Sequence, residues 1–185
     1  MTIIRQEDLI SSVADALQYI SYYHPVDFIQ AVKQAYDREE SKAAKDAMAQ
    51  ILVNSRMCAM GHRPICQDTG IVTVFVRVGM DVQWQGDMSL TDMINEGVRR
   101  AYTHPDNVLR ASILSDPDGE RKNTGDNTPA VIHYDIVPGN SVAIDVAAKG
   151  GGSEAKSKFA MLNPSDSVVD WVLKMVPTMG AGWCP

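Results

Sequence analysis

The spacing of apolar residues changes along the chain, from a helical period in the first third to an alternating or continuous pattern in the middle. Four apolar residues recur at intervals of three or four in the opening segment, at Leu9, Val13, Leu17 and Ile20. This period predicts an amphipathic helix. Pro25 interrupts it and suits the first turn of a second helix. A third helix is predicted over SKAAKDAMAQILV (41–53), which is rich in helix-forming residues.

The middle of the chain has the pattern of β-strands. The segment IVTVFVRVGM (71–80) is β-branched and almost entirely apolar, which predicts a strand buried on both faces. Two further segments, VIHYDIV (131–137) and SVAIDVAAK (141–149), flank the turn residues PGN. Strands on either side of such a turn are typical of a hairpin, so we expect these two strands to pair with each other.

Two more helices and one long loop complete the prediction. SLTDMINEGVRRAY (89–102) begins with a capping-box pattern. ERKNTGDNTP (120–129) has the composition of a long ordered loop, and PSDSVVDWVLKMV (164–176) predicts a last helix that starts near Pro164 or Ser165. The fold class that follows is α/β, with a helical N-terminal third packed on a mixed β-sheet.

Composition narrows the classes of function. The chain has 185 residues, enough for one domain or a large part of one, and a formal net charge of −6. Its Lys and Arg residues are scattered, which disfavours a nucleic-acid partner. Neither a secretory apolar segment nor a stretch of ~20 apolar residues occurs, so we expect a cytoplasmic protein without a membrane span. Three cysteines in such a chain disfavour a disulfide framework.

A cysteine and a carboxylate stand together in GHRPICQDTG (61–70), where Cys66 precedes Gln67 and Asp68. A cysteine nucleophile needs a neighbouring base, usually a histidine. A nearby carboxylate disfavours the thiolate unless a cation offsets it, whereas a coordinated metal deprotonates the thiol outright. The pattern therefore favours a metal-bound Cys66 over a free nucleophile, and a buried thiol remains the alternative.

Two glycine-rich segments follow later in the chain. KGGGSEAK (149–156) offers backbone N–H groups and two lysines to an anion, although it lacks the ending of a P-loop, and a simple flexible turn remains the alternative. GAGWCP (180–185) places Cys184 before a proline, as in some iron–sulfur ligand runs. Between these motifs and the first strand, Arg110, Asn123 and Asn127 each suit a surface position when taken singly, although Arg also suits bidentate carboxylate recognition.

The motifs CQDTG, NTGDNTPA (123–130), KGGGSE and GWCP, in this order, resemble the iron–sulfur hydro-lyases of the class I fumarase and L-tartrate dehydratase family. The resemblance covers nearly the whole chain and corresponds to the N-terminal part of the catalytic unit. It implies a [4Fe–4S] cluster with Cys66 and Cys184 as thiolate ligands, and a third cysteine further along. It also implies the reversible hydration of fumarate to L-malate, a step of the tricarboxylic acid cycle, at an iron left open by three-thiolate ligation.

The resemblance also assigns roles to individual residues. Gln67 and Asp68 would line the substrate pocket, with Asp68 as the acid or proton-relay group. Arg110 would clamp one carboxylate of a small dicarboxylic acid. The backbone N–H groups of Gly150 and Gly151 would hold the other. Cys58 is not part of the family motif.

We expect residues 1–185 to be the N-terminal (alpha) domain of a larger hydro-lyase, truncated at its C-terminus and inactive as this fragment, because TMGAGWCP is an atypical terminus. The family suggests a homodimer for the longer protein. One alternative is an L-tartrate dehydratase, and another is a non-catalytic scaffold in which Cys66 and Cys184 are plain thiols. A nucleotide-binding glycine loop is disfavoured because neither a Walker lysine nor a Rossmann motif is present.

Overall fold

The computed structural model describes residues 2–107, 109–150 and 158–180, which fall into two compact units, Met1–Lys149 and Gly150–Pro185. The described residues of the first unit form nine helices and strands. They are β1 (Thr2–Arg5), α1 (Gln6–Tyr22), α2 (Val26–Arg38), α3 (Lys42–Gly61), β2 (Ile71–Gly79), β3 (Val82–Gln85), α4 (Leu90–Tyr102), β4 (Val131–Val137) and β5 (Val142–Lys149).

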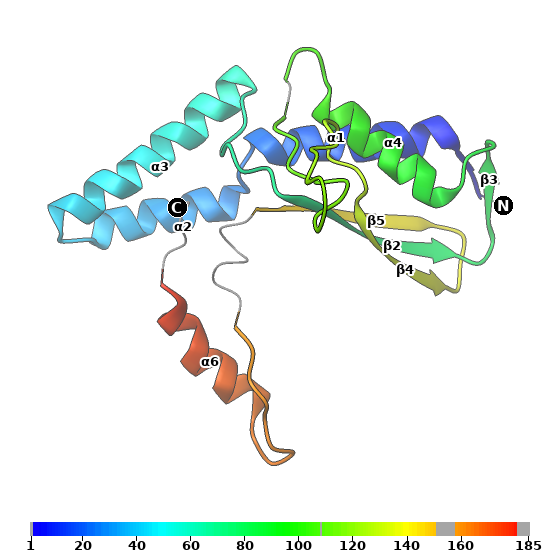
Figure 1. Ribbon diagram of the computed structural model, residues 1–185. Helices are drawn as coiled ribbons and strands as arrows, with labels where there is room; N and C mark the ends of the chain where they lie inside the picture. The colour runs from blue at the N-terminus through cyan, green and yellow to red at the C-terminus, as the bar shows by residue number, and fades with distance from the viewer. Residues whose placement is uncertain (1, 108, 151–157, 181–185) are drawn as a thin grey trace. The chain divides into compact units, whose positions relative to one another are not determined.

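A three-stranded mixed sheet forms the centre of the first unit, with the order β4-β2-β5 (Figure 1). Strand β2 runs parallel to β4 and antiparallel to β5. The two short strands β1 and β3 form a separate parallel pair, which the residue pattern had not indicated. They are only four residues long, too short for a period to be visible in the sequence.

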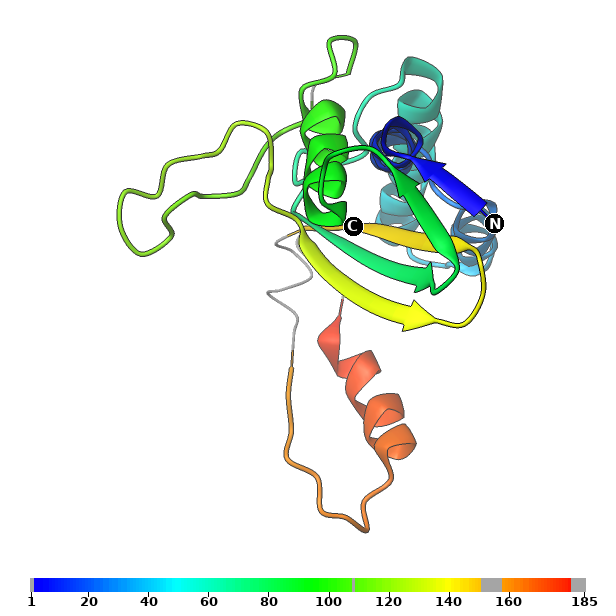
Figure 2. The ribbon, with the colours of Figure 1, turned by 90° about the vertical axis from the view of Figure 1, so that its right-hand side faces the viewer.

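Helices α1 and α4 cover one face of this sheet (Figures 1 and 2). Their apolar sides and the inward side chains of β2 form the core, and the predicted helical period of the opening segment is confirmed. Ser89 caps α4, as predicted, because its hydroxyl accepts the N–H of Asp92 at 3.1 Å. The buried core consists of Leu9, Ile10, Val13, Leu17, Val72, Val74, Val76, Met93, Ile94, Val98, Ala101, Tyr102 and Leu109.

Helices α2 and α3 pack mainly against each other, and α2 has no buried residue. Pro25 is the N-cap of α2 rather than a residue of its first turn. The third helix is confirmed but continues to Gly61, beyond the predicted segment. Its buried residues, Ser55 and Cys58, lie in its C-terminal half, next to the loop that leads into β2.

The expectation that β2 is buried on both faces is wrong within the described residues. Val72, Val74 and Val76 are buried under the helices, whereas Phe75 on the other face is 48% exposed. That second face is held by contacts between strands: Phe75 stacks on His133 with ring centroids 4.8 Å apart. Its β-branched and aromatic residues therefore act as cross-strand partners rather than as a second layer of core.

The predicted hairpin is also wrong, because β2 lies between β4 and β5. The PGN turn passes over the end of β2, where the N–H of Gly79 donates to the carbonyl of Ser141 at 2.8 Å. A Cβ at Gly79 would lie 2.4 Å from the Gly139 carbonyl oxygen, so only glycine permits this crossing. A turn and two alternating segments look the same in the sequence whether the strands pair directly or flank a third.

The second unit contains α6 (Val168–Met179) among its described residues. Its N-cap is Ser167, whose hydroxyl accepts the N–H of Asp170 at 3.2 Å, so the predicted last helix is confirmed but begins later than expected. None of its residues is buried within this chain. Most of the glycine-rich segment at 149–156 lies outside the described residues.

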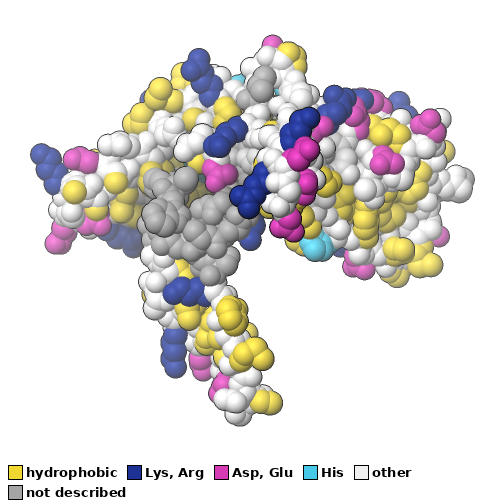
Figure 3. Space-filling model, in the orientation of Figure 1, with side chains coloured by type: hydrophobic (Ala, Val, Ile, Leu, Met, Phe, Trp, Pro, Cys, Tyr) yellow, Lys and Arg dark blue, Asp and Glu magenta, His cyan; other side chains and the backbone are white. Residues whose placement is uncertain are grey.

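Two properties of the described surface bear on partners. Basic and acidic side chains are interspersed over the face seen in Figure 3. In the part of the chain that the structure describes, no helix combines the length and the apolar character needed to cross a membrane.

Candidate functional site

The loop between α3 and β2 carries the CQDTG motif and is anchored on its N-terminal side by two helices. Helix α3 ends at Gly61, and His62 takes a left-handed conformation with φ 47°. The N–H of Ile65 donates to the carbonyl of Ser21 at 2.8 Å. The side-chain amide of Asn54 donates to the carbonyl of Ile65 at 3.1 Å. Both the N–H and the carbonyl of Ile65 are thus hydrogen-bonded, which fixes the backbone next to Cys66.

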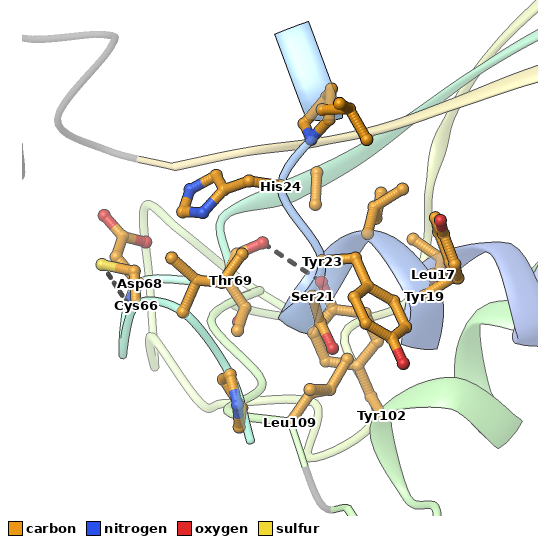
Figure 4. Close-up of a pocket in the computed structure, with 16 residues that line it drawn as sticks. Leu17, Tyr19, Ser21, Tyr23, His24, Cys66, Asp68, Thr69, Tyr102 and Leu109 are labelled. Atoms are coloured by element: carbon orange, nitrogen blue, oxygen red, sulfur yellow. Dashed lines mark hydrogen bonds between the residues drawn. The ribbon is translucent and has the colours of Figure 1, made fainter. Parts of the chain in front are cut away.

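The CQD segment itself is a tight turn closed by its own polar groups. The N–H of Asp68 donates to the Cys66 sulfur at 3.4 Å. The N–H of Gly70 donates to a carboxylate oxygen of Asp68 at 3.2 Å. Cys66 and Asp68 are half-buried, whereas Gln67 is exposed. The turn therefore presents the sulfur and the carboxylate from the same short piece of backbone (Figure 4).

The C-terminal side of the motif is held by buried side chains of α4 and of the loop 103–130. The hydroxyl of Tyr102 donates to the carbonyl of Thr69 at 3.1 Å. The side-chain amide of Asn127 donates to the carbonyl of Gly70 at 3.0 Å. The Thr69 hydroxyl donates to the backbone carbonyl of Arg110. The expectation of a surface position is wrong for Asn127, which is 0% exposed.

The sheet topology places the ends of CQDTG and NTGDNTPA and the start of KGGG at one end of the sheet. CQDTG ends at Gly70, directly before β2, and NTGDNTPA ends at Ala130, directly before β4, which runs parallel to β2. KGGG begins at Lys149, the last residue of β5, and Lys149 pairs with Ile71 in the antiparallel register. Segments that are far apart in the sequence therefore start or end at the same end of the sheet.

A pocket of about 570 Å³ opens beside the CQDTG loop (Figure 4). Cys66 and Asp68 lie at one side of it, and apolar side chains from the end of α1 and from Leu109 form much of the rest. The described lining contains neither lysine nor arginine. It consists of Leu17, Tyr19, Ile20, Ser21, Tyr23, His24, Pro25, Val26, Pro64, Ile65, Cys66, Asp68, Thr69, Tyr102, Leu109 and Ala148.

His24 is the one histidine among the described lining residues, and its surroundings favour the neutral ring. Its Nδ1 lies 3.0 Å from the hydroxyl of buried Ser55, and the ring stacks on Phe28 at 4.5 Å between centroids. Burial lowers the pKa of His24, because desolvation disfavours the imidazolium. The pocket is therefore supplied with a hydrogen-bonding group rather than a fixed positive charge.

The residues that the sequence singled out are distributed unequally around this pocket. Cys66 and Asp68 line it, whereas Gln67 and Arg110 are exposed and are not among its lining residues. Arg110 nevertheless belongs to the same neighbourhood through its backbone, which accepts the Thr69 hydroxyl.

Three further candidates belong to the glycine-rich and GWCP segments. Gly150 follows the end of β5 directly. Gly151 and Cys184 lie outside the described residues, and the expected meeting of Cys66 and Cys184 therefore stays a prediction.

The third cysteine has a different setting from Cys66. Cys58 is buried, and its thiol contacts the side-chain oxygen of Asn54 at 3.5 Å and the carbonyl of Pro64 at 3.6 Å. Both contacts support the start of the 62–70 loop. Cys58 thus packs inward, as expected for a residue outside the family motif.

The chemistry around Cys66 suits a thiolate ligand of an iron–sulfur cluster. Its sulfur is a free thiol, partly accessible, and it accepts a backbone N–H, which is the kind of hydrogen bond that tunes such sulfurs. Within residues 2–107, 109–150 and 158–180, no group of three or more His, Cys, Asp or Glu side chains is placed to hold a metal ion. Cys66 can accordingly serve as one ligand of a set that includes positions beyond these ranges.

Comparison with known proteins gives one family and a set of relatives. Residues 10–185 match the family model described as fumarate hydratase (Fumerase). The L(+)-tartrate dehydratase subunit alpha of Escherichia coli K12 is 31% identical over 181 residues, which cover 96% of this chain and 59% of that protein. A protein of Methanocaldococcus jannaschii, whose name assigns it provisionally to the same subunit type, is 30% identical over 179 residues, covering 94% of this chain and 62% of its own. The chain thus spans about three-fifths of the length of the curated relatives it matches.

Proposed function

This chain belongs to the fumarate hydratase (Fumerase) family, and we propose that it contributes the CQDTG part of the active site to a hydro-lyase that interconverts fumarate and L-malate by addition of water. The observation that carries the proposal is that CQDTG, NTGDNTPA and Lys149 lie at one end of the sheet, beside a pocket lined by Cys66 and Asp68.

Cys66 and Cys184 are the residues of this chain that would hold a [4Fe–4S] cluster. When bound through three thiolates, such a cluster supplies an open iron that acts as a Lewis acid toward a carboxylate and a hydroxyl oxygen. The half-buried sulfur of Cys66, fixed through Ile65 and through the N–H of Asp68, is suited to this ligation.

Asp68 is the group of this chain best placed to hold or move a proton. Its carboxylate oxygen accepts the N–H of Gly70, and the residue lines the pocket next to Cys66. A carboxyl group at such a position can exchange a proton with a substrate or a water within hydrogen-bonding reach. Its backbone and side chain are both tied into the CQD turn, so the carboxylate would keep its orientation during the reaction.

The pocket wall described here brings little positive charge to a dianionic substrate, because its lining contains neither lysine nor arginine. We therefore assign the carboxylates of the substrate to groups around the pocket rim. The guanidinium of Arg110 would bind one of them in bidentate fashion. The backbone N–H groups of Gly150 and Gly151 would bind the other, with Gln67 as an additional exposed polar contact.

L-tartrate dehydration is the second candidate, and the relatives favour it. Both relatives described above carry names that refer to L(+)-tartrate dehydratase alpha subunits. An alpha subunit implies an assembly, so the chain would function within an oligomer, and a homodimer is the form expected from the family. A cytoplasmic location fits either substrate.

Iron content measured after anaerobic reconstitution with ferrous iron and sulfide tests the cluster assignment. The experiment uses the full-length protein and its variants Cys66→Ser, Cys184→Ser and Cys58→Ser. We expect Cys66→Ser and Cys184→Ser to lose most of the bound iron and the visible absorption of the cluster. Cys58→Ser is the matched control, because Cys58 contacts only protein groups, and it should retain iron.

Two results would contradict the proposal in different ways. Retention of iron by Cys66→Ser, or no iron in the unmodified protein, would favour the scaffold with plain thiols. If iron is bound, turnover of L-malate and of L-tartrate under anaerobic conditions decides between the two substrates. A higher kcat/KM for L-tartrate would replace the fumarate assignment without affecting the cluster.

A further inference from the structure

The carbonyl groups of Thr69 and Gly70 are both bound by buried side chains that come from other parts of the fold. Tyr102, at the end of α4, is 1% exposed and donates its hydroxyl to the Thr69 carbonyl at 3.1 Å. Asn127, in the loop before β4, is 0% exposed and donates its amide to the Gly70 carbonyl at 3.0 Å. Two successive carbonyls of the motif are thus held from two directions.

Asn127 also ties the motif to the loop that carries Arg110. Its side-chain oxygen accepts the N–H of Ser112 at 2.7 Å, while its amide nitrogen donates to Gly70. Asn127 adopts φ 61°, a left-handed conformation that Asn and Asp tolerate better than other residues with a side chain. An asparagine meets two requirements at this position: it tolerates the left-handed backbone, and its short amide reaches both Ser112 and Gly70.

Tyr102 lies close to the same amide. Burial raises the pKa of the Tyr102 hydroxyl, and its hydrogen bonds with Thr69 and Asn127 partly oppose that rise. A raised pKa favours the protonated hydroxyl, which is the form that donates to the Thr69 carbonyl. The Thr69 hydroxyl completes the set by donating to the Arg110 carbonyl.

We propose that Asn127 and Tyr102 are positioning residues that fix the main chain of Asp68, Thr69 and Gly70, and thereby hold the Cys66 sulfur and the Asp68 carboxylate in place. Neither side chain needs to touch the substrate for this role. The two hydrogen bonds on successive carbonyls prevent the peptide planes from rotating, and the Asp68 carboxylate is in turn bound to the N–H of Gly70. Loss of either donor would leave a buried carbonyl without a partner, and the CQD turn would open to relieve it.

The catalytic importance of this inference rests on the proposed function. The hydrogen bonds from Tyr102 and Asn127, here called the local clamp, should also hold Cys66 in place when its thiol is free. A site-resolved alkylation experiment tests it without iron or substrate. The variants Asn127→Asp and Tyr102→Phe each remove one donor: Asp keeps the left-handed backbone and the acceptor for Ser112, and Phe keeps the buried ring. The rate of iodoacetamide modification is measured separately at Cys66 and at Cys58 by peptide mass spectrometry, well below the unfolding temperature.

We expect the modification rate of Cys66 to rise roughly threefold or more in both variants, because local opening exposes the half-buried thiol, while the rate of Cys58 stays unchanged. The control is Ile10→Val, a substitution in the buried core on α1 that lowers global stability and leaves both donors to the CQDTG loop in place. Its Cys66 rate should equal that of the unmodified protein.

An unchanged Cys66 rate in both donor variants would overturn the proposal. So would an equal rise at Cys58 and Cys66, or a matching rise in Ile10→Val, since either shows general loosening rather than a local clamp. If Asn127→Asp does not fold, Tyr102→Phe decides alone. Failure of the iron-binding test described above leaves these rates unaffected, so the two proposals fail separately.

Discussion

Two pairs of packed helices in the first unit contrast sharply in burial. Helices α1 and α4 contribute nine of the residues that form the core, and Ile94 of α4 is 0% exposed. Helices α2 and α3 bury only Ser55 and Cys58, although α2 carries aromatic and aliphatic residues at helical spacing. Figure 3 shows hydrophobic side chains at the surface of this second pair. An apolar period thus predicts a helix and one of its faces, but not what covers that face.

The difference also separates two contributions to the candidate site. The α1–α4 pair provides the rigid support of the sheet and, through Tyr102, one donor to the CQDTG loop. The α2–α3 pair contributes through Val26 at the start of α2, which lines the pocket, and through the C-terminal half of α3, where Asn54 binds the Ile65 carbonyl and Ser55 binds His24. Substitutions in the first pair should therefore affect the free energy of unfolding strongly, and substitutions far along the second pair should not.

The largest expected contrast is between Ile94→Ala and Ile29→Ala, the same substitution in the two pairs. Ile94 is fully buried, so its truncation should lower the free energy of unfolding by about 3 kcal/mol through lost burial and a residual cavity. Ile29 is 36% exposed, and its truncation should cost about 1 kcal/mol or less. Urea unfolding followed by circular dichroism measures both. Equal losses would show that α2 is as well covered as α4 in solution.

A second contrast concerns close approach of helices. A Cβ at Gly97 of α4 would lie 2.7 Å from Val13 Cβ and 2.8 Å from the Ile10 carbonyl oxygen, so Gly97→Ala should force α1 and α4 apart and cost about 2 kcal/mol. At Gly61, the last residue of α3, the nearest atom would be a side-chain carbon of Arg63 at 3.7 Å. Gly61→Ala should change stability by about 0.5 kcal/mol or less, with a gain favoured by reduced entropy of the unfolded chain. A loss at Gly61 as large as at Gly97 would remove the distinction.

Sequence reasoning found the helices and the reactive loop because both depend on local signals. The Leu9 to Leu17 period, the Ser89 cap and the CQDTG motif are each contained within a few residues, and local propensity and tertiary structure agree there. The mixed α/β fold class is confirmed for the same reason, and so is the family.

The errors concern which segments become neighbours. Insertion of β2 between β4 and β5 depends on the close contact of Gly79 with Gly139, and a PGN turn carries no sign of it. The burial of Asn127 depends on the carbonyl of Gly70, which lies 57 positions earlier in the chain. An asparagine in a polar loop that contains glycine and proline has the same local signature whether it is exposed in a turn or binds a distant carbonyl. The structure therefore adds Asn127, Tyr102 and His24 to the residues around the site.

An ionic contrast of intermediate size is expected at Glu96. Hydrogen bonds from Arg99 and then Arg100 lower the pKa of Glu96 from 4.5 to about 2, and Arg100 also pairs with Glu7 of α1. Because the folded pKa lies below the unfolded value, the ion pairs stabilise the fold above pH 4.5, and this stabilisation is lost as the pH falls toward 2. The arginines are partly exposed, so Glu96→Gln should cost only about 1 kcal/mol at pH 7.

The pH dependence provides the check on this ionic contribution. Stability of the Glu96→Gln variant and of the unmodified protein, measured by urea unfolding at pH 7 and at several values below pH 4.5, should converge with acid. Glu40→Gln is the control: Glu40 is exposed between α2 and α3, and its substitution should leave the curve unchanged at every pH. A constant difference at all pH values would indicate that packing of the Glu96 side chain, rather than its charge, supports α4.

The smallest expected effect lies on the outer side of α3, and it asks whether the exposure of the second helix pair persists in solution. Met57 is 66% exposed and Met60 is 75% exposed. In an isolated chain, Met57→Ser should change the free energy of unfolding by about 0.5 kcal/mol or less, whereas Met93→Ser, at a position 3% exposed, should cost about 2 kcal/mol or more. If Met57→Ser instead lowers Tm, and the loss grows with protein concentration, another chain must cover α3. The contrast between the two helix pairs would then belong to the single chain and not to the assembled protein, and the apolar residues on the outer side of α3 would be explained by contacts with another chain.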